Sequence, residues 1–364
     1  MKNKIYSSIL ILLIVVSCSK TDSSIIIGSG TGSGSGSGSE GGSSSSWLIP
    51  VNEVHDGGPG KDGIPSLDTP IFLEYSDADV DSYMADDELI VGVFLNNEAK
   101  AYPYKILNWH EVVNDGIGEH KYTISYCPLT GTAFGWESLI RDDHTQFGVS
   151  GLLYNSNLIL YDRKTNSNWS QIGMQCVNGV AMGQKPTLFD VVETTWGKWK
   201  QQFPKSKILS DEQGFPLRYN NYPYGPYKED HSYFLFPFSI ENPAIPNKER
   251  VHVVYNGKSA KVYQFNTFAN VRMIRDSFFG KEILVVGDQN IIYSFELTSE
   301  TTNLVFEYQS NSLGYFLTDN EGNKWTVFGE AIEGPRTGKK LAPVTSFMSY
   351  WFAVPPFFSD VEIY

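Results

Sequence analysis

The chain has 364 residues, with 28 Lys and Arg against 41 Asp and Glu, which gives a formal net charge of −13. An acidic chain without a basic run lacks the side chains that neutralise phosphates, which argues against nucleic acid as a partner. We interpret the acidity as serving solubility. The length is sufficient for two domains or one large domain.

The N-terminal residues have the pattern of a bacterial lipoprotein signal. Two lysines precede the apolar run Ile5–Val16, which is too short for a spanning helix of roughly 20 apolar residues. Ser17 then places a small residue directly before Cys18, as in a lipobox. We expect residues 1–17 to be a signal peptide and Cys18 to be lipidated. The alternative is an ordinary cleaved signal with an incidental cysteine.

Residues 18–46 are predicted to form the lipidated cysteine and a flexible tether, because a run of Gly and Ser cannot bury apolar surface. The anchor would attach the protein to a membrane of the cell envelope, expected to be the outer membrane. The sequence leaves open whether the body, residues 47–364, faces the periplasm or the cell surface.

A hairpin pattern occurs twice in the body. Residues 87–102 reappear as residues 248–263, and each copy has two β-rich runs around a turn, Asn96-Asn97 in one and Asn256-Gly257 in the other. Turn residues between two such runs are typical of a β-hairpin. The sequence therefore indicates an internal repeat.

A second block also recurs. Residues 162–173 match residues 319–329, with Trp169 opposite Trp325. Because the matching Trp, Gly and Asp residues occur in both copies, we interpret them as determinants of the fold. The first copy then continues into a short helix, for which Thr194 or Thr195 is the predicted N-cap, Trp196, Trp199 and Phe203 the buried face, and Pro204 the end.

The predicted fold class is mainly β, a β-rich α+β protein with short helices. It consists of two tandem related units, about residues 80–215 and 246–364. A Tyr- and Pro-rich crossover, residues 216–245, joins them.

Candidate reactive groups occur in the first copy alone. At matched positions His110 corresponds to Val271, and Cys127 falls on a segment whose counterpart has no cysteine. A duplicated fold needs its packing residues twice but its chemistry only once. We therefore predict a site with His110 and Cys127 as candidate catalytic residues. The candidate supporting residues are Glu111, Tyr126 and Thr130.

His110 and Cys127 would allow a soft-metal site for copper or zinc, a Cys/His nucleophilic pair, or thiol redox chemistry. A structural cysteine beside a hydrogen-bonded histidine is the alternative. A disulfide between Cys127 and Cys176 is a further possibility in an oxidising envelope. The sequence names no metal or cofactor, and it leaves open whether the protein is an enzyme.

Several segments resemble the family catalogued as domain of unknown function 3179. They are Tyr102-Pro103, Trp109–Asp115, Ser125–Leu129, Gly148–Trp169, Pro223–Gly225, Glu333–Pro335 and Trp351–Ala353. The resemblance covers most of the body and implies an architecture but no mechanism. Many members have Cys-Pro-Leu-Cys where this chain has Cys127-Pro-Leu-Thr130, which argues against a two-cysteine metal or redox role.

We expect an envelope-anchored lipoprotein whose Cys/His site binds a metal or small ligand or performs thiol-dependent chemistry. The alternative is a non-catalytic binding or scaffold protein at the cell surface. The 21 Tyr and 8 Trp residues could then stack on sugars or peptides, although most aromatic side chains belong in cores. The membrane, through the lipid anchor, is the expected partner; any protein or small-molecule partner stays unknown.

Overall fold

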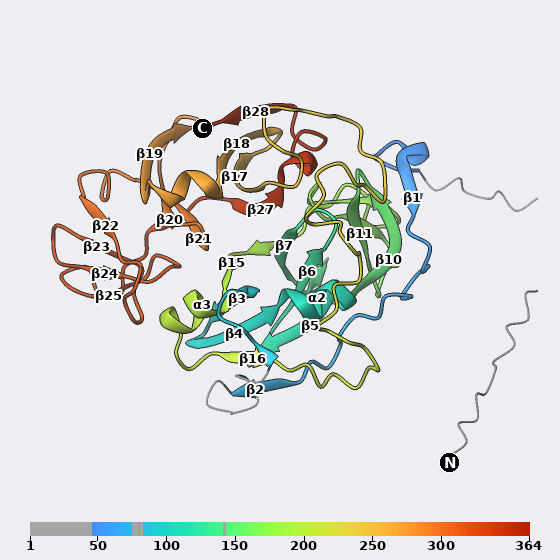
Figure 1. Cartoon of the computed structure of the whole chain (residues 1–364), viewed down its shortest axis with the longest axis horizontal. Coiled ribbons are helices and arrows are strands. Elements are labelled where there is room, and N and C mark those ends of the chain that lie inside the picture. The colour runs from blue at the N-terminus through green and yellow to red at the C-terminus, as the bar shows by residue number, and fades with distance from the viewer. Residues whose placement is uncertain (1–45, 75–79, 81–82, 141–142) are drawn as a thin grey trace, which may run out of the picture. The chain divides into compact units, whose positions relative to one another are not determined.

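A computed structural model describes residues 46–74, 80, 83–140 and 143–364 (Figure 1). The predicted signal peptide, Cys18 and nearly all of the tether lie outside these residues. No helix among the described residues is long and apolar enough to cross a membrane. The body is mainly β, as the hairpin patterns in the sequence predict.

The first half of the body contains three main sheets, which are mostly antiparallel and are coloured from blue to yellow-green in Figure 1. One sheet has the order β15 (Val192–Thr195), β3 (Leu89–Leu95), β4 (Glu98–Pro103), β16 (Lys207–Leu209) and β2 (Phe72–Glu74). The next has β14 (Leu188–Phe189), β7 (Thr132–Glu137), β6 (His120–Cys127) and β5 (Val112–Ile117). The third has β1 (Val54–Asp56), β10 (Phe147–Tyr154), β11 (Asn157–Asp162), β12 (Asn168–Ser170) and β13 (Gln175–Asn178).

Three sheets of the second half are coloured in orange and red. The first has the order β27 (Ser346–Tyr350), β17 (Arg250–Asn256), β18 (Ser259–Gln264) and β28 (Asp360–Ile363). The second has β19 (Met273–Phe278), β20 (Lys281–Asp288), β21 (Ile291–Glu296) and β26 (Ala342–Pro343). The third has β22 (Phe306–Tyr308), β23 (Leu317–Asp319), β24 (Lys324–Trp325) and β25 (Ala331–Glu333).

Short elements complete the described chain. They are the hairpin of β8 (Leu139–Ile140) and β9 (Asp143–His144), the helices α2 (Tyr104–His110) and α3 (Trp196–Gln202), and the 3-10 turns η1 (Val51–Glu53), η2 (Phe265–Ala269) and η3 (Trp351–Ala353).

The strand arrangement of the first half recurs in the second. The β3–β4 hairpin has an antiparallel neighbour, β15, on one side and a parallel neighbour, β16, on the other. The β17–β18 hairpin has antiparallel β27 and parallel β28 in the same places. The four-stranded meander β14-β7-β6-β5 likewise has the order of β26-β21-β20-β19.

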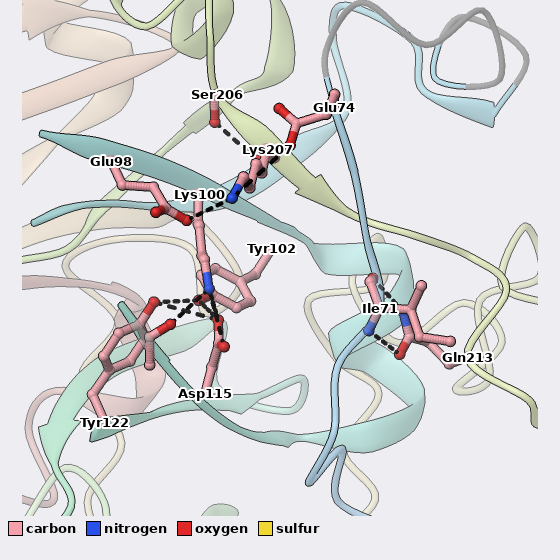
Figure 2. A network of polar contacts seen from close by, with 11 residues as sticks. Ile71, Glu74, Glu98, Lys100, Tyr102, Asp115, Tyr122, Ser206, Lys207 and Gln213 are labelled. Carbon is pink, nitrogen blue, oxygen red and sulfur yellow. Dashed lines mark hydrogen bonds and ion pairs between the residues drawn. The ribbon is translucent and has the colours of Figure 1, made fainter. Parts of the chain in front are cut away.

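A buried ion pair beside the first hairpin ties two sheets together (Figure 2). The Lys100 Nζ atom lies 2.9 Å from Asp115 Oδ2, and the Tyr102 hydroxyl donates to the same oxygen at 2.6 Å. Tyr122 joins through its hydroxyl, 2.8 Å from that of Tyr102. The Asp115 carboxylate is thus both ion-paired and hydrogen-bonded. A charged group at a partly buried position needs such partners, because burying an unpaired charge is costly.

The second hairpin carries the same network. Lys261 Nζ lies 2.8 Å from Asp276 Oδ2, and the Tyr263 hydroxyl donates to that carboxylate at 2.8 Å. The matched tryptophans are held alike, because Trp169 Nε1 donates to Asp162 at 3.0 Å and Trp325 Nε1 donates to Asp319 at 2.8 Å. Both tryptophan side chains are fully buried.

Helix α3 begins where the sequence predicts. The Thr195 hydroxyl accepts a hydrogen bond from the Lys198 amide, as an N-cap does. The buried Trp199 ring lies directly on β3, where a Cβ at Gly92 would come within 2.3 Å of it. Only a glycine allows the helix to pack this closely. The Trp199 ring also contacts Phe328 of the second half, with centroids 6.4 Å apart, so residues of both halves share one hydrophobic core.

Candidate functional site

His110, at the end of α2, is completely buried and both of its ring nitrogens have partners. Nδ1 lies 2.7 Å from the Pro65 carbonyl, which can only accept, so Nδ1 carries the proton. Nε2 lies 2.7 Å from the Tyr219 hydroxyl and therefore accepts from it. Burial lowers the His110 pKa, so the ring is neutral near pH 7. In this arrangement neither nitrogen is open to a metal or a substrate.

Cys127, the last residue of β6, is a free thiol with 1% of its surface exposed. Its Sγ lies 3.7 Å from the Ser156 carbonyl, a weak hydrogen bond. Burial, together with the nearby Glu111 carboxyl, raises the Cys127 pKa to about 11. The thiol is therefore protonated near neutral pH, whereas a nucleophilic or metal-binding cysteine acts as the thiolate.

Among the described residues, His110 and Cys127 share no hydrogen bond or ring contact. That part of the chain also contains no group of three or more His, Cys, Asp or Glu side chains placed to hold a metal. Cys127 forms no disulfide with Cys176, whose Sγ lies 3.3 Å from the Asn178 carbonyl. A functional pairing of His110 and Cys127 stays a prediction.

Glu111 follows His110 in a strained conformation, with a φ of +56°. Its carboxyl is buried, and the Tyr224 hydroxyl donates to Oε1 at 3.3 Å. Burial raises the Glu111 pKa to about 7. The side chain lines a small, largely apolar cavity of about 60 Å³ with Leu129 and Tyr224.

Thr130 belongs to the turn between β6 and β7 and joins it to the second half. Its hydroxyl lies 2.8 Å from that of Thr132, and its carbonyl accepts from the Tyr350 amide at 2.7 Å. At the next position Gly131 has a φ of +61°, and a Cβ there would lie 3.2 Å from the Tyr350 ring. The turn therefore serves to seat β27 against the first half.

Tyr126 lines a larger cavity, of about 350 Å³, which we call the tyrosine cavity. Its wall comes from the first half, the crossover and the second half. The side chains that line it include four tyrosines and three cations: Tyr104, Tyr126, Tyr222, Tyr350, Lys105, Lys228 and Arg250, with Asp87, Glu88, Leu89, Asn108 and Gly131 completing the wall. Of the predicted site residues, only Tyr126 lies on this wall.

The tyrosine hydroxyls around this cavity are donors throughout the physiological pH range. Burial raises the pKa of Tyr350 to about 12 and that of Tyr104 well above its usual value. Tyr104 donates a short hydrogen bond to Glu193, a fully buried carboxyl on β15 whose pKa burial raises to about 7. Tyr104 and Tyr126 pack together with ring centroids 4.4 Å apart.

Two buried polar atoms on the wall have no hydrogen-bond partner among the described residues, Arg250 Nη2 and the Tyr222 hydroxyl. The Arg250 guanidinium lies over the Phe265 ring, 4.5 Å from its centroid, which fixes its plane. None of the described carboxylates forms an ion pair with it. Unsatisfied buried donors are costly and call for an explanation.

Residues 61–361 match the family described as a protein of unknown function, DUF3179. The chain belongs to the DUF3179 family. Neither curated proteins nor solved structures provide a match. Membership in DUF3179 brings no activity with it, so the site must be argued from its own geometry.

The comparison of the two copies leads to polar residues unique to the first copy, and of the site residues predicted in this way only Tyr126 lines the tyrosine cavity of this DUF3179 protein. Arg250 stands opposite Leu89 in the hairpin match, and both line the cavity. Arg250 is a polar residue unique to the second copy, as His110 is unique to the first, so the same asymmetry marks both residues. Tyr222 had a weaker signal, its place in the Tyr-rich crossover.

Proposed function

We propose that this DUF3179 protein is a lipid-anchored protein of the cell envelope that binds a small ligand in the tyrosine cavity. The observation that carries the proposal is a cavity of about 350 Å³ with two buried, unpartnered donors on its wall. Ligand pockets typically have volumes from about 300 Å³ upward and combine aromatic walls with a few convergent polar groups. A ligand that reached the Arg250 and Tyr222 donors would satisfy them.

Of the chemistries that His110 and Cys127 suggest, small-ligand binding has the best support. A thiolate nucleophile is disfavoured by the raised Cys127 pKa, and metal binding by the full occupation of the His110 ring. Cys127 still lies close enough to Tyr222 and Tyr350 to influence the pKa of their hydroxyls. Within this proposal, Cys127 packs behind the cavity wall and His110 holds α2 in place.

A surface that stacks on sugars has less support. Six of the eight tryptophans, Trp136, Trp169, Trp196, Trp199, Trp325 and Trp351, are fully buried. Their rings pack in the hydrophobic cores and present no platform to a ligand from solution.

The test is to fill the cavity. Asn108 lines it from α2, and Asn108→Trp would place an indole in the space; Asn270→Trp, at an exposed position beside η2, is the matched control. Saturation-transfer NMR would screen small aromatic acids, alcohols and amines against the full-length chain in lipid nanodiscs, with empty nanodiscs subtracted.

Compounds that bind the unmodified protein should lose binding in the Asn108→Trp variant and keep it in the Asn270→Trp variant. If no compound binds, or if binding survives Asn108→Trp unchanged, the tyrosine cavity is not a ligand site.

A further inference from the structure

We propose that the tyrosine cavity selects a small organic monoanion, a carboxylate attached to a flat apolar or aromatic body. This inference rests on the proposed function and names the class of ligand that the cavity takes.

The first argument is the state of Arg250. Its Nη2 atom is buried without a hydrogen-bond partner among the described residues, and its guanidinium is held against the Phe265 ring. A guanidinium cannot release its proton, so it stays a cation whether or not a ligand is present. A half-buried, oriented cation with a donor to spare is the side chain that proteins use to bind carboxylates.

The second argument is the balance of charge along the wall. Lys105 is already engaged, by Glu88 at 3.0 Å and by the Tyr83 carbonyl. Lys228 has its ammonium group 5.2 Å from the centroid of the Tyr222 ring. With Glu88 paired, the positive charges of Arg250 and Lys228 are opposed on the lining by Asp87 alone. An anion is therefore favoured over a cation.

Glu193 is a further acid close to Arg250, and its place behind Tyr104 limits its effect. The Tyr104 hydroxyl donates to it, and the backbone amides of Ala133 and Met348 also hydrogen-bond the carboxyl. Burial raises its pKa, while Arg250 lowers it without forming an ion pair. Glu193 thus has its own donors and leaves Arg250 Nη2 unpartnered.

The donor count points to a carboxylate. Arg250 Nη2 and the Tyr222 hydroxyl offer two donors without partners, which matches the two oxygens of a carboxylate. A phosphate group has three oxygens and a charge approaching −2 near pH 7, and it would leave more acceptors unpaired. The four tyrosine rings then supply an apolar wall for a flat body.

The pseudo-equivalence of the two halves supports the same conclusion. Leu89 and Arg250 occupy corresponding hairpin positions, beside Thr195 on β15 and Tyr350 on β27 respectively. Both residues line the cavity, so an apolar residue and a cationic one contribute to the same wall from equivalent positions. That combination suits a molecule with an apolar part and an anionic part.

The experiment compares benzoate, benzyl alcohol and benzylamine, which share a ring and differ in charge, on the full-length chain in nanodiscs by titration calorimetry. Benzoate should bind most tightly. Arg250→Gln should weaken benzoate by about tenfold or more and leave benzyl alcohol within about twofold, because the lost hydrogen bond is to a charged group. Arg250→Lys keeps the positive charge but lacks the paired N–H donors of the guanidinium. Its benzoate affinity should therefore lie between those of the unmodified protein and the Arg250→Gln variant.

Arg336→Gln is the matched control, since Arg336 pairs with Glu321 on the surface and does not line the cavity. Tyr222→Phe removes the second donor with little change of shape, and it should weaken the binding of benzoate but not that of the other two compounds. This variant provides the test if Arg250→Gln fails to fold. Tighter binding of benzyl alcohol or benzylamine than of benzoate would refute the anion preference while leaving the ligand cavity standing. If none of the three compounds binds and the saturation-transfer screen finds no other ligand, both proposals are refuted.

Discussion

Replacing Glu111 with Gln should stabilise the protein above neutral pH, although it removes a charged side chain. The Glu111 carboxyl is 7% exposed, and burial raises its pKa from 4.5 to about 7. The native state therefore holds a proton that the unfolded chain releases. Stability is greatest below the unfolded pKa and falls as pH rises through the folded pKa.

The size of the effect follows from the two pKa values. Each pKa unit corresponds to about 1.4 kcal/mol, so full ionisation of Glu111 costs about 3 kcal/mol, of which about 2 to 3 kcal/mol is lost between pH 5 and pH 8. Gln keeps an oxygen that can accept from Tyr224 and carries no charge. Glu111→Gln should gain stability relative to the unmodified chain at pH 8, and much less at pH 5.

Urea unfolding of the full-length chain at pH 5 and pH 8 gives the comparison, followed by tryptophan fluorescence. Glu119→Gln, at an exposed turn position, is the control and should change stability equally at both pH values. Glu193→Gln should also raise stability more at pH 8 than at pH 5, because burial raises the Glu193 pKa to about 7 as well. A Glu111→Gln variant that is destabilised by the same amount at pH 5 and pH 8 would refute the reasoning.

Three shorter predictions follow. Cys18→Ala should move the protein from the membrane to the soluble fraction, and continued membrane retention would exclude the lipid anchor. Iodoacetamide at pH 8 should label Cys127 only after unfolding, since a pKa of about 11 leaves on the order of one thiolate in a thousand; rapid native labelling would restore the Cys/His interpretation. Trp169→Phe and Trp325→Phe should each cost about 1 to 3 kcal/mol in urea unfolding, because each leaves a carboxylate without its indole donor, and a neutral result at either position would show that the two are not equivalent.

Local signals in the sequence predict much of the fold. The Asn96-Asn97 turn closes the first hairpin as predicted, with positive φ at both residues. The second turn lies one residue later than predicted, at Gly257-Lys258, because Asn256 still pairs with Ser259; Gly257 supplies the positive φ. Thr195 caps α3 as its side chain suggests. These features succeed because they depend on a few adjacent residues. The packing of α3 on Gly92 of β3 depends on residues far apart in the chain, and no local pattern marks it.

We propose that the two halves descend from one duplicated unit. The support is the matching strand order around each hairpin and the Lys, Tyr and Asp network that each half contains; Figure 2 shows that of the first half. Sequence self-comparison finds this relation because fold-determining residues recur at a constant offset. It says less about a cavity that lies where the two halves and the crossover meet.

That difference explains why, of the predicted site residues, only Tyr126 lines the tyrosine cavity. His110 and Cys127 were selected for their reactivity, and in the structure each has local partners that account for it: Pro65 and Tyr219 for the ring, and a buried strand end for the thiol. Arg250 is chemically ordinary, and its significance comes from what surrounds it.

A guanidinium on the surface would be solvated and would need no partner, whereas Arg250 Nη2 is buried and has none among the described residues. Burial of a donor is set by tertiary structure, through the ring of Phe265 below it and Tyr350 on the neighbouring strand. A reactive residue type is one indication of a functional site. An unsatisfied buried donor on a cation beside a cavity is the stronger evidence, because leaving that donor unpaired has a free-energy cost that an anionic ligand in contact with it would remove.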